Sequence, residues 1–524
     1  MTVKTLVKRS EYHDSVRLML VARELAKLPG VIDAAVVMAT EANKSILKDS
    51  GLLTAEAQAA TPNDLVIAVS AKNGASDAAL AEAEKLLQKK GEAAAGEAAE
   101  FRPKTIPGAV KSSPGANVAV ISVAGRYAAD EAWEALRRGL HVLLFSDNVT
   151  LEDEIALKKY ARDHGLLLMG AGAGTAILNG VALGFANVIP SGPVGIVSAA
   201  GTCLQEVSTL LAKYGVGITQ GIGTGGRDLK EEVGGIMMLE GLKSLQADPA
   251  TKVIALVSKP PAKSVVEKVM AQVALSDKPT VVCFLGGDPK LVSAANAVPA
   301  MTLEEAARLS AQRAGAAVKV SPEAVERDLK KQARKLSTKL KPGQRYLRGL
   351  FSGGTLCYEA QVIWRGMLKE PVLSNAPLDQ ASQLPDSTHS QKHTAVDLGE
   401  EEFTVGRPHP MIDNDLRIRR LLQEARDRQV AVILLDVVLG YGAHPDPASE
   451  LGPAVRQARE LARKAGRELI VVASVAGTEE DPQRLSRQVQ AMTAAGAIIC
   501  DSNAAAARLT GMVVSKGPRR KDKG

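Results

Sequence analysis

The sequence predicts an α/β protein made of several parallel-sheet domains. Its 524 residues are 46% apolar and only 3% aromatic, and 46 of them are glycines. This composition is typical of aliphatic sheets that are joined to helices by tight turns. Apolar runs alternate with amphipathic helical patterns along most of the chain. A strand–turn–helix unit occurs twice, as PVGIVSAAGTCLQE at residues 193–206 and as YLRGLFSGGTLCYE at residues 346–359.

The first part of the chain predicts two different α/β domains. Residues 1–100 alternate short apolar runs with helical patterns, which predicts a small N-terminal α/β domain followed by a linker rich in Ala, Gly and Pro. Residues 116–191 open with the apolar strand NVAVISVAG and repeat strand and helix, which predicts a Rossmann-like doubly wound sheet. Such sheets bind ligands at the carboxyl ends of their strands. The candidate substrate-binding residues at these ends are Ser122, Gly125 and Asn148.

The second part predicts one flavodoxin-like domain in two copies. Residues 192–316 and 345–512 each open with the duplicated unit, and each continues with a Gly-Arg pair and further buried strands. Residues 317–344 predict a basic linker helix between the copies, and residues 513–524 predict a disordered basic tail.

The duplicated unit predicts a phosphate site. A strand-to-helix turn leaves backbone N–H groups unpaired at the positive end of the helix dipole, and anions bind there. One such turn alone is explained by close packing, but two copies favour an anion site between them. The phosphate-binding candidates are Gly201, Thr202, Gly354 and Thr355.

The Gly-Arg pairs and one histidine supply the candidate catalytic side chains. Arg227 and Arg407 are suited to clamp a carboxylate or phosphate through two hydrogen bonds. Gly226 and Gly406, which precede them, are further substrate-binding candidates. His409 lies between two prolines beside Arg407, as a donor or a general acid/base. The alternative is that each arginine lies on the surface. Glu206 and Glu359, one turn into their helices, are as well explained by capping as by catalysis.

Charge and cysteine usage exclude several classes of protein. The net charge is +7, but the basic excess lies in residues 327–348 and 516–523, which favours a solvated helix and a terminus over a nucleic-acid surface. No apolar run approaches the ~20 residues of a membrane helix. The cysteines lack metal-ligand spacing, which predicts buried reduced thiols and a cytoplasmic protein. Asp397, Asp413 and Asp436 could bind magnesium, but we expect no metal. The cysteines are Cys203, Cys283, Cys357 and Cys500.

The motifs carry a family resemblance. SGPVGIVSAAGTCLQE, with GLLLMGAGAGT upstream, resembles the α-subunit of succinyl-CoA synthetase, and residues 352–510 resemble the C-terminal domain of its β-subunit. The whole chain resembles the FdrA family more closely, through FSDNVTLEDEIALKKYARDHGLLLMG, GGRDLKEEVGG, LVSKPPA and TVGRPHPMIDNDL. The resemblance implies a Rossmann-like CoA-binding-type domain and two flavodoxin-like ligase-type domains, with the helices that begin at Gly201 and Gly354 facing each other.

Three parts of the synthetase machinery are not found. FLGGDPKLVSAANAV, which follows Cys283, has no histidine where the family's phosphohistidine is expected. Only the linker helix stands where a nucleotide-binding ATP-grasp domain would precede residue 345. LVKRSEYHDSVRL lacks a glycine-rich loop for the CoA phosphates. We therefore expect no CoA or ATP cofactor, and inorganic phosphate as the co-substrate.

The FdrA resemblance implies a reaction. That family belongs with allantoin and ureide breakdown, as the large subunit of an oxamate carbamoyltransferase that turns oxalurate and phosphate into oxamate and carbamoyl phosphate with companion subunits. Phosphate between the two helix starts would attack the ureido carbonyl. Two alternatives remain open: an acyl-CoA synthetase subunit whose nucleotide domain lies on a partner, and a non-catalytic scaffold for companion subunits.

Overall fold

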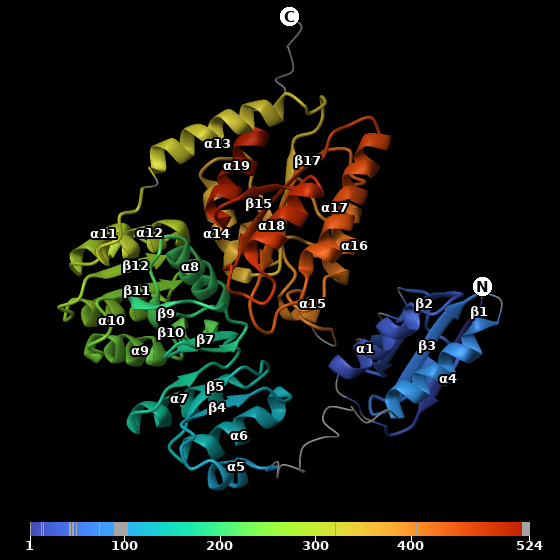
Figure 1. Ribbon diagram of the computed structural model, residues 1–524, viewed down its shortest axis with the longest axis horizontal. Coiled ribbons are helices and arrows are strands. Elements are labelled where there is room, and N and C mark those ends of the chain that lie inside the picture. Colours follow the sequence, from blue (N-terminus) through green and yellow to red (C-terminus); the bar gives the residue numbers. More distant parts are fainter. Residues whose placement is uncertain are drawn as a thin grey trace, which may run out of the picture. The chain divides into compact units, whose positions relative to one another are not determined.

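The computed structural model describes residues 2–11, 13, 15–40, 43–44, 47–48, 50–72, 74–88, 103–319, 321–404 and 407–515 (Figure 1). The chain divides into two compact units. The smaller unit is Met1–Arg102 with Glu401–His409, and the larger is Pro103–Glu400 with Pro410–Gly524. The prediction of an α/β protein with a small N-terminal domain is confirmed. No helix among the described residues is long and apolar enough to cross a membrane.

The smaller unit is an antiparallel sheet with helices on both faces. Its strand order is β1-β3-β2. Successive side chains of the central strand point to opposite faces, so Leu65 and Ile67 pack under α1 and α4, while Val66 and Ala68 pack under α3. The elements are β1 (Thr2–Lys8), α1 (Ser15–Ala26), β2 (Val31–Met38), α3 (Ala55–Ala59), β3 (Leu65–Ala71) and α4 (Ala75–Gln88).

The larger unit begins with a short parallel sheet, β4-β5-β6. Thr150 caps α7 by accepting a hydrogen bond from Asp153 N. The predicted boundary at residue 191 falls after two strands, β7 and β8, that pair with the next sheet instead. The elements are α5 (Ile106–Ser112), β4 (Val118–Ile121), α6 (Gly125–Leu136), β5 (His141–Leu144), α7 (Leu151–Asp163) and β6 (Leu168–Met169).

The next sheet, with its helices, is here called the first ligase-type domain. Its order is β13-β12-β11-β9-β10-β7-β8, and β9 to β13 run parallel. The strands are β7 (Thr175–Leu178), β8 (Val181–Gly184), β9 (Ser191–Ser198), β10 (Ile218–Gly223), β11 (Val253–Ser258), β12 (Thr280–Phe284) and β13 (Val298–Pro299). The helices are α8 (Gly201–Lys213), η1 (Gly226–Leu229), α9 (Ile236–Ala247), α10 (Lys263–Val273), α11 (Pro289–Ala294) and α12 (Leu303–Arg313).

The last sheet, with its helices, is called the second ligase-type domain. Its order is β15-β16-β14-β17-β18-β19. Apart from edge strands, both domains follow the 2-1-3-4-5 order of flavodoxin-like sheets. The strands are β14 (Tyr346–Phe351), β15 (Val372–Ser374), β16 (His393–Asp397), β17 (Val430–Val438), β18 (Ile470–Ala476) and β19 (Ile498–Cys500). The helices are α14 (Gly354–Arg365), η2 (Gln380–Ser382), α15 (Glu401–Thr404), α16 (Asp415–Glu424), α17 (Pro447–Lys464), α18 (Leu485–Ala494) and α19 (Asn503–Ser515).

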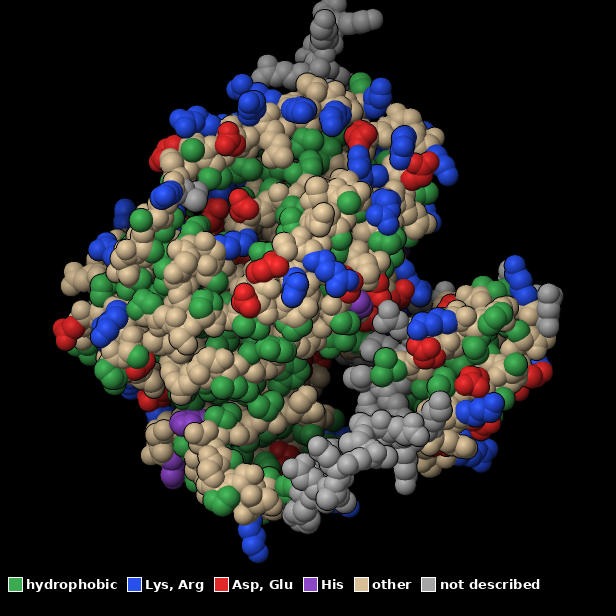
Figure 2. Space-filling model, in the orientation of Figure 1, with side chains coloured by type: hydrophobic (Ala, Val, Ile, Leu, Met, Phe, Trp, Pro, Cys, Tyr) green, Lys and Arg blue, Asp and Glu red, His purple; other side chains and the backbone are tan. Residues whose placement is uncertain are grey.

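The linker helix α13 (Pro322–Ser337) joins the two ligase-type domains. Ser321 caps it and Pro322 occupies its first turn. Leu329, Ala333 and Leu336 are buried on its inner side, and the helix packs along α19. Lys and Arg side chains gather over its outer edge in Figure 2, as expected for a solvated basic helix.

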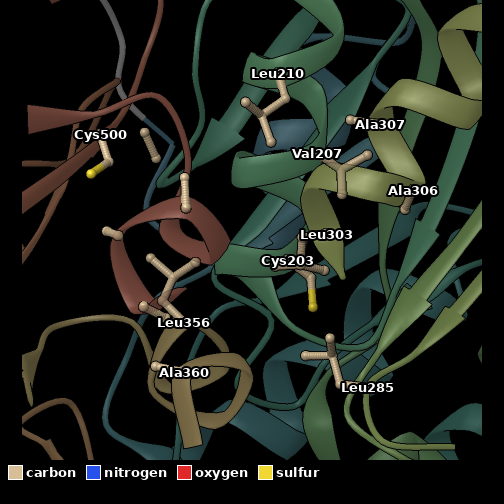
Figure 3. Close-up of a cluster of buried hydrophobic side chains, with 14 of the residues drawn as sticks. Cys203, Val207, Leu210, Leu285, Leu303, Ala306, Ala307, Leu356, Ala360 and Cys500 are labelled. Carbon is tan, nitrogen blue, oxygen red and sulfur yellow. The ribbon is translucent and has the colours of Figure 1, made fainter. Parts of the chain in front are cut away.

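One apolar core continues across the seam between the ligase-type domains. In the first domain α8 packs on α12, in the second α14 packs on α19, and α8 also touches α14. Figure 3 shows this core, with Cys203 and Val207 from α8, Leu303 from α12 and Leu356 from α14. The seam therefore holds the two duplicated helices face to face.

Candidate functional site

The candidate site lies where α8 and α14 begin. Each helix starts directly after a buried strand, and neither Ala200 nor Gly353, its N-cap, offers a capping side chain. A Cβ on Gly353 would lie 2.8 Å from Thr202 Cγ2, so the two helix starts are in contact. The structure thus brings together the four predicted phosphate-binding residues, which are Gly201, Thr202, Gly354 and Thr355.

A buried carboxylate already occupies the turn before α14. Asp436, in β17, accepts hydrogen bonds from Ser352 N at 2.8 Å and from Gly353 N at 2.8 Å. The Ser352 hydroxyl donates to it at 3.0 Å. Arg417 Nη2, from α16, donates to the other carboxylate oxygen at 2.9 Å, and both side chains are nearly fully buried. The N–H groups of Ser352 and Gly353 therefore bind an internal anion rather than an external one.

Asp397 and Lys259 lie against the first residue of α14. A Cβ on Gly354 would lie 2.5 Å from Asp397 Oδ2 and 3.6 Å from Lys259 Nζ. Asp397 ends β16, whereas Lys259 follows β11 of the other ligase-type domain. Burial raises the pKa of Asp397 to about 7, although nearby Lys259 opposes the shift. The site therefore combines an ammonium group with a carboxyl group that can hold a proton at neutral pH.

Glycine-rich loops surround the start of α8. A Cβ on Gly201 would lie 2.7 Å from Thr175 Oγ1, and one on Gly223 would lie 2.1 Å from Thr175 O. The loop before β7 and the loop after β10 can approach this closely only because side chains are missing. Thr224 Oγ1 is buried here without a hydrogen-bond partner. The first ligase-type domain therefore supplies backbone and hydroxyl groups at this point.

Two glutamates cap helices across the seam. Glu206 Oε1, from α8, accepts a hydrogen bond from Asn503 N, the first residue of α19, at 2.9 Å. Glu359 Oε1, from α14, accepts one from Leu303 N, the first residue of α12, at 2.7 Å. Glu359 Oε2 also accepts from Asn503 Nδ2 at 2.7 Å. Burial raises the pKa of both carboxyls, that of Glu359 to about 7. Each glutamate thus caps the closing helix of the other domain.

Arg227 does not lie in an open clamp. Its Nε is 2.7 Å from Glu154 Oε2, and Lys158 Nζ is 2.8 Å from the other oxygen of this fully buried glutamate. Lys158 also pairs with Asp228, at 2.9 Å. The Gly226–Leu229 turn is therefore fixed to α7 by a buried ion network. An arginine that must neutralise Glu154 has less charge to offer a substrate.

The structure does not place the other Gly-Arg pair with the helix starts. Arg407 and His409 belong to the smaller unit, while Gly201 and Gly354 belong to the larger one. Gly406 lies outside the described residues. The catalytic roles suggested for Arg407 and His409 therefore stay predictions.

The third predicted group lies at the β4–α6 turn. A Cβ on Gly125 would lie 2.1 Å from Asp147 O and 2.6 Å from Asn148 O, so Ser122, Gly125 and Asn148 come from two adjoining turns. α6 begins without a capping side chain, and Arg126 and Tyr127 in its first turn are exposed. This combination suits an anionic ligand that also carries an aromatic ring.

The cysteines are free and buried, as predicted. Burial raises the pKa of Cys203 and Cys500 to about 12, and it raises those of Cys283 and Cys357 as well, so these thiols are poor nucleophiles. In the described part of the chain, no group of three or more His, Cys, Asp or Glu residues could hold a metal.

Sequence reasoning missed three side chains at the seam: Lys259, Arg417 and Asn503. Lys259 follows an apolar strand in LVSKPPA, so its place at a carboxyl strand end was readable, but its reach into the other domain was not. Arg417 and Asn503 sit in ordinary helical patterns, and no local signal marks them.

Comparison with known proteins decides the family. The chain is 44% identical over 521 residues to the uncharacterised protein YahF of Escherichia coli K12, which covers 99% of both chains. The chain belongs to the YahF family. Family models match this YahF-family chain at residues 350–513, as a CoA-ligase domain, and at residues 1–103, as the AllF heavy metal-associated domain. All four cysteines lie beyond residue 200, so residues 1–103 have no thiolate to offer a heavy metal.

More distant relatives are CoA ligases. Subunit SauD of the ADP-forming sulfoacetate–CoA ligase of Bilophila wadsworthia is 27% identical over 34% of this chain and 61% of its own length. The α-subunit of the ADP-forming succinate–CoA ligase of Staphylococcus epidermidis is 29% identical over 28% of this chain and 49% of its own. ATP citrate lyase from Methanothrix soehngenii is similar over 40% of each chain, at 19% identity and a TM-score of 0.36.

These relatives correct the predicted reaction. The prediction of a carbamoyltransferase is wrong, because the matching domain and the named relatives are CoA ligases. The relation to succinyl-CoA synthetase is confirmed, whereas assignment to the FdrA family stays a prediction. The cytoplasmic location stays a prediction. The expected absence of CoA and ATP is untested, and a CoA-ligase function would require CoA as a co-substrate.

Proposed function

We propose that this chain is a CoA-ligase-type subunit that holds an acid, or its activated acyl group, where α8 and α14 meet. The observation that carries the proposal is the contact between the two helix starts, which places Lys259 of one ligase-type domain beside Asp397 of the other. Helix dipoles, a cation and a protonatable carboxyl are suited to bind and polarise an acyl or phosphoryl group.

The relatives supply the substrate class. Their names pair succinate or sulfoacetate with CoA, so the proposed substrate is a small organic acid that carries at least one carboxylate. Acyl-CoA formation would join the acyl carbon of the acid's acyl phosphate to the CoA sulfur, with cleavage of the bond from that carbon to the phosphate oxygen. Inorganic phosphate would leave, and the thiol proton would pass to it or to solvent. The proposed CoA position is the β4–α6 turn, where uncapped N–H groups and Arg126 would hold the phosphates, while Tyr127 and Val123 present exposed apolar surface.

Nucleotide handling is assigned to a companion subunit. The turn after β12, Leu285–Gly287, packs toward α14, since a Cβ on Gly286 would lie 3.6 Å from Val362. This turn offers no histidine that could carry a phosphoryl group between sites. The relatives are named as subunits, which agrees with a divided enzyme. We therefore expect this chain to act in a hetero-oligomer.

Thioester formation tests the proposal. The full chain, with each candidate companion subunit, would be supplied with ATP, CoA and a panel of small dicarboxylic and sulfonated acids, and acyl-CoA would be measured by mass spectrometry. CoA binding to the chain alone would be measured by calorimetry. We expect CoA binding and one acid that is converted. The proposal would be overturned if the chain bound no CoA and no companion subunit yielded a thioester.

A non-catalytic scaffold is the second candidate, and one observation favours it. Asp436 already accepts hydrogen bonds from the N–H groups of Ser352 and Gly353, as expected of a purely structural turn. Lys259→Met in the assembled complex separates the two functions. A scaffold would keep full activity, whereas a CoA-ligase-type site would lose most of it at unchanged assembly, as measured by size-exclusion chromatography.

A further inference from the structure

Lys259 reaches from the first ligase-type domain to the first residue of α14. Its Nζ and Asp397 Oδ2 both lie within 3.6 Å of the point where a Cβ on Gly354 would stand. Among the described residues Lys259 makes no ion pair within 4.0 Å, and its ammonium lies 5.7 Å from the centre of the Tyr358 ring. Pro260 and Pro261 follow at once and stiffen the backbone beyond Lys259. The ammonium therefore faces the seam with its charge available.

Asp397 presents one carboxyl oxygen to the same place. Its Oδ1 accepts a hydrogen bond from Gly399 N at 2.9 Å, whereas Oδ2 faces Gly354. The side chain is 2% exposed, and burial raises its pKa to about 7. Glu400 and Asp436 raise the pKa further, and Lys259 lowers it. The charged or titratable groups that face Asp397 are Lys259, Glu400, Cys357, and Asp436 with its partner Arg417.

The spacing of these two groups favours a bound anion over a direct ion pair. An ammonium and a carboxylate that served only to join the domains would close to hydrogen-bond distance, as Arg417 and Asp436 do at 2.9 Å. Among the described residues, Lys259 and Asp397 form no ion pair within 4.0 Å, although both approach Gly354. A Cβ on Gly354 would lie 2.5 Å from Asp397 Oδ2, so the absence of a side chain is what lets Asp397 reach this point.

We propose that Lys259 and Asp397 bind one oxyanion between them, a carboxylate or a phosphate group, and that Asp397 takes up a proton when the anion binds. One oxygen of the anion contacts the Lys259 ammonium, and another accepts a hydrogen bond from the protonated Asp397 carboxyl. The inference rests on the proposed function for the identity of the anion, which is the acid substrate or the phosphate group of its activated form. Proton uptake by Asp397 makes the affinity for the anion, and not only the rate of the reaction, dependent on pH.

Calorimetry on the full chain tests the proposal with two probes that do not titrate near neutral pH. Sulfate stands for phosphate, and acetate stands for a carboxylate. We expect at least one probe to bind, with an affinity about tenfold higher at about pH 6 than at about pH 8, because only protonated Asp397 donates. Buffers of different ionisation enthalpy should report the uptake of one proton. Binding of sulfate alone assigns a phosphate group, and binding of acetate alone assigns the acid substrate.

Two variants, each with a matched control, decide whether this pair is responsible. Lys259→Met should abolish binding, while Lys263→Met, an exposed lysine at the start of α10, should not change it. Asp397→Asn should bind equally at both pH values, because an amide donates without titrating. The matched control Asp277→Asn, at an exposed site, should keep the pH dependence.

Three results would overturn the inference: no binding of either probe, binding that survives Lys259→Met, or pH dependence that survives Asp397→Asn. The proposed function is tested apart from it. Acyl-CoA formation without this anion binding would reject only the inference, whereas anion binding without acyl-CoA formation would reject only the function.

Discussion

The two ligase-type domains lead into their duplicated helices in different ways. In the first, β9 passes into α8 through small residues, and the neighbouring strand β11 ends in Leu-Val-Ser without a carboxylate. In the second, β14 passes into α14 between Asp397 and Asp436, at the ends of the two strands that flank it. Strand order and helix starts are alike, but the charges at those starts are not.

The two domains remain equivalent where they support each other. Thr302 caps α12 through Glu305 N, and Ser502 caps α19 through Ala505 N. In each case a glutamate from the opposite domain binds the first N–H of the helix. The duplication is therefore preserved in the helix caps that join the two domains. It is lost at the starts of α8 and α14, where a binding site requires different groups on its two sides.

The largest expected effect comes from removing Asp436, the buried carboxylate beside the start of α14 in the second ligase-type domain. Asp436→Ala would leave Arg417 buried without its partner and three donors unpaired, which typically costs about 3–5 kcal/mol. Denaturant unfolding would measure the loss. Asp436→Ala with Arg417→Leu should recover part of the stability, and no recovery would show that the hydrogen bonds to the turn matter more than the ion pair.

A smaller effect is expected from the shared caps. Glu359→Ala and Glu206→Ala should each lower the free energy of unfolding by about 1–3 kcal/mol, because buried donors lose their acceptor. Glu359→Ala should cost more, since among the described residues Glu359 accepts from Leu303 and Asn503, whereas Glu206 accepts from Asn503 alone. Equal losses would contradict this difference between the domains. Glu267→Ala, on the exposed face of α10, is the matched control.

The third expected effect is a pH dependence of stability. The folded-state pKa of Glu359 is about 7, above its usual value, so the folded chain binds this proton more tightly than the unfolded chain. Stability is then greatest below the unfolded pKa and falls as the pH rises toward 7. Glu359→Gln should make the curve less steep between about pH 5 and about pH 7, as measured by thermal unfolding midpoints, while the raised pKa of Asp397 keeps part of the slope. A steeper curve in the variant would count against this assignment.

The duplicated domains were readable from the sequence because they depend on local patterns. Buried parallel strands give continuous apolar runs, and Gly-Thr after such a run marks a strand-to-helix turn in both copies. The edge strands were less readable. Thr175–Leu178 looks like part of the preceding domain, and only its pairing with β10 assigns it to the next sheet.

The sequence predicted the facing helix starts of the site but not its charged contacts, because these join residues far apart in the sequence. The meeting of Thr202 with Gly353 follows from the duplication, and it was predicted as two helices facing each other. Arg227 was expected to clamp a carboxylate or phosphate, because a Gly-Arg pair follows the strand-to-helix turn in both copies. Its neutralisation by Glu154, far away in the sequence, has no local signal.

The crossed caps also set an order of events during synthesis. Leu303 leaves the ribosome before Glu359 has been added to the chain. The Leu303 N–H at the start of α12 therefore has no Glu359 acceptor until part of the second domain has been synthesised. Asn503 is synthesised last, when its acceptor Glu206 is already part of the chain. A nascent chain that stalls within α13 would therefore have the Leu303 N–H without its Glu359 acceptor, and the surfaces of α8 and α12 that pack on the second domain would be exposed to chaperones.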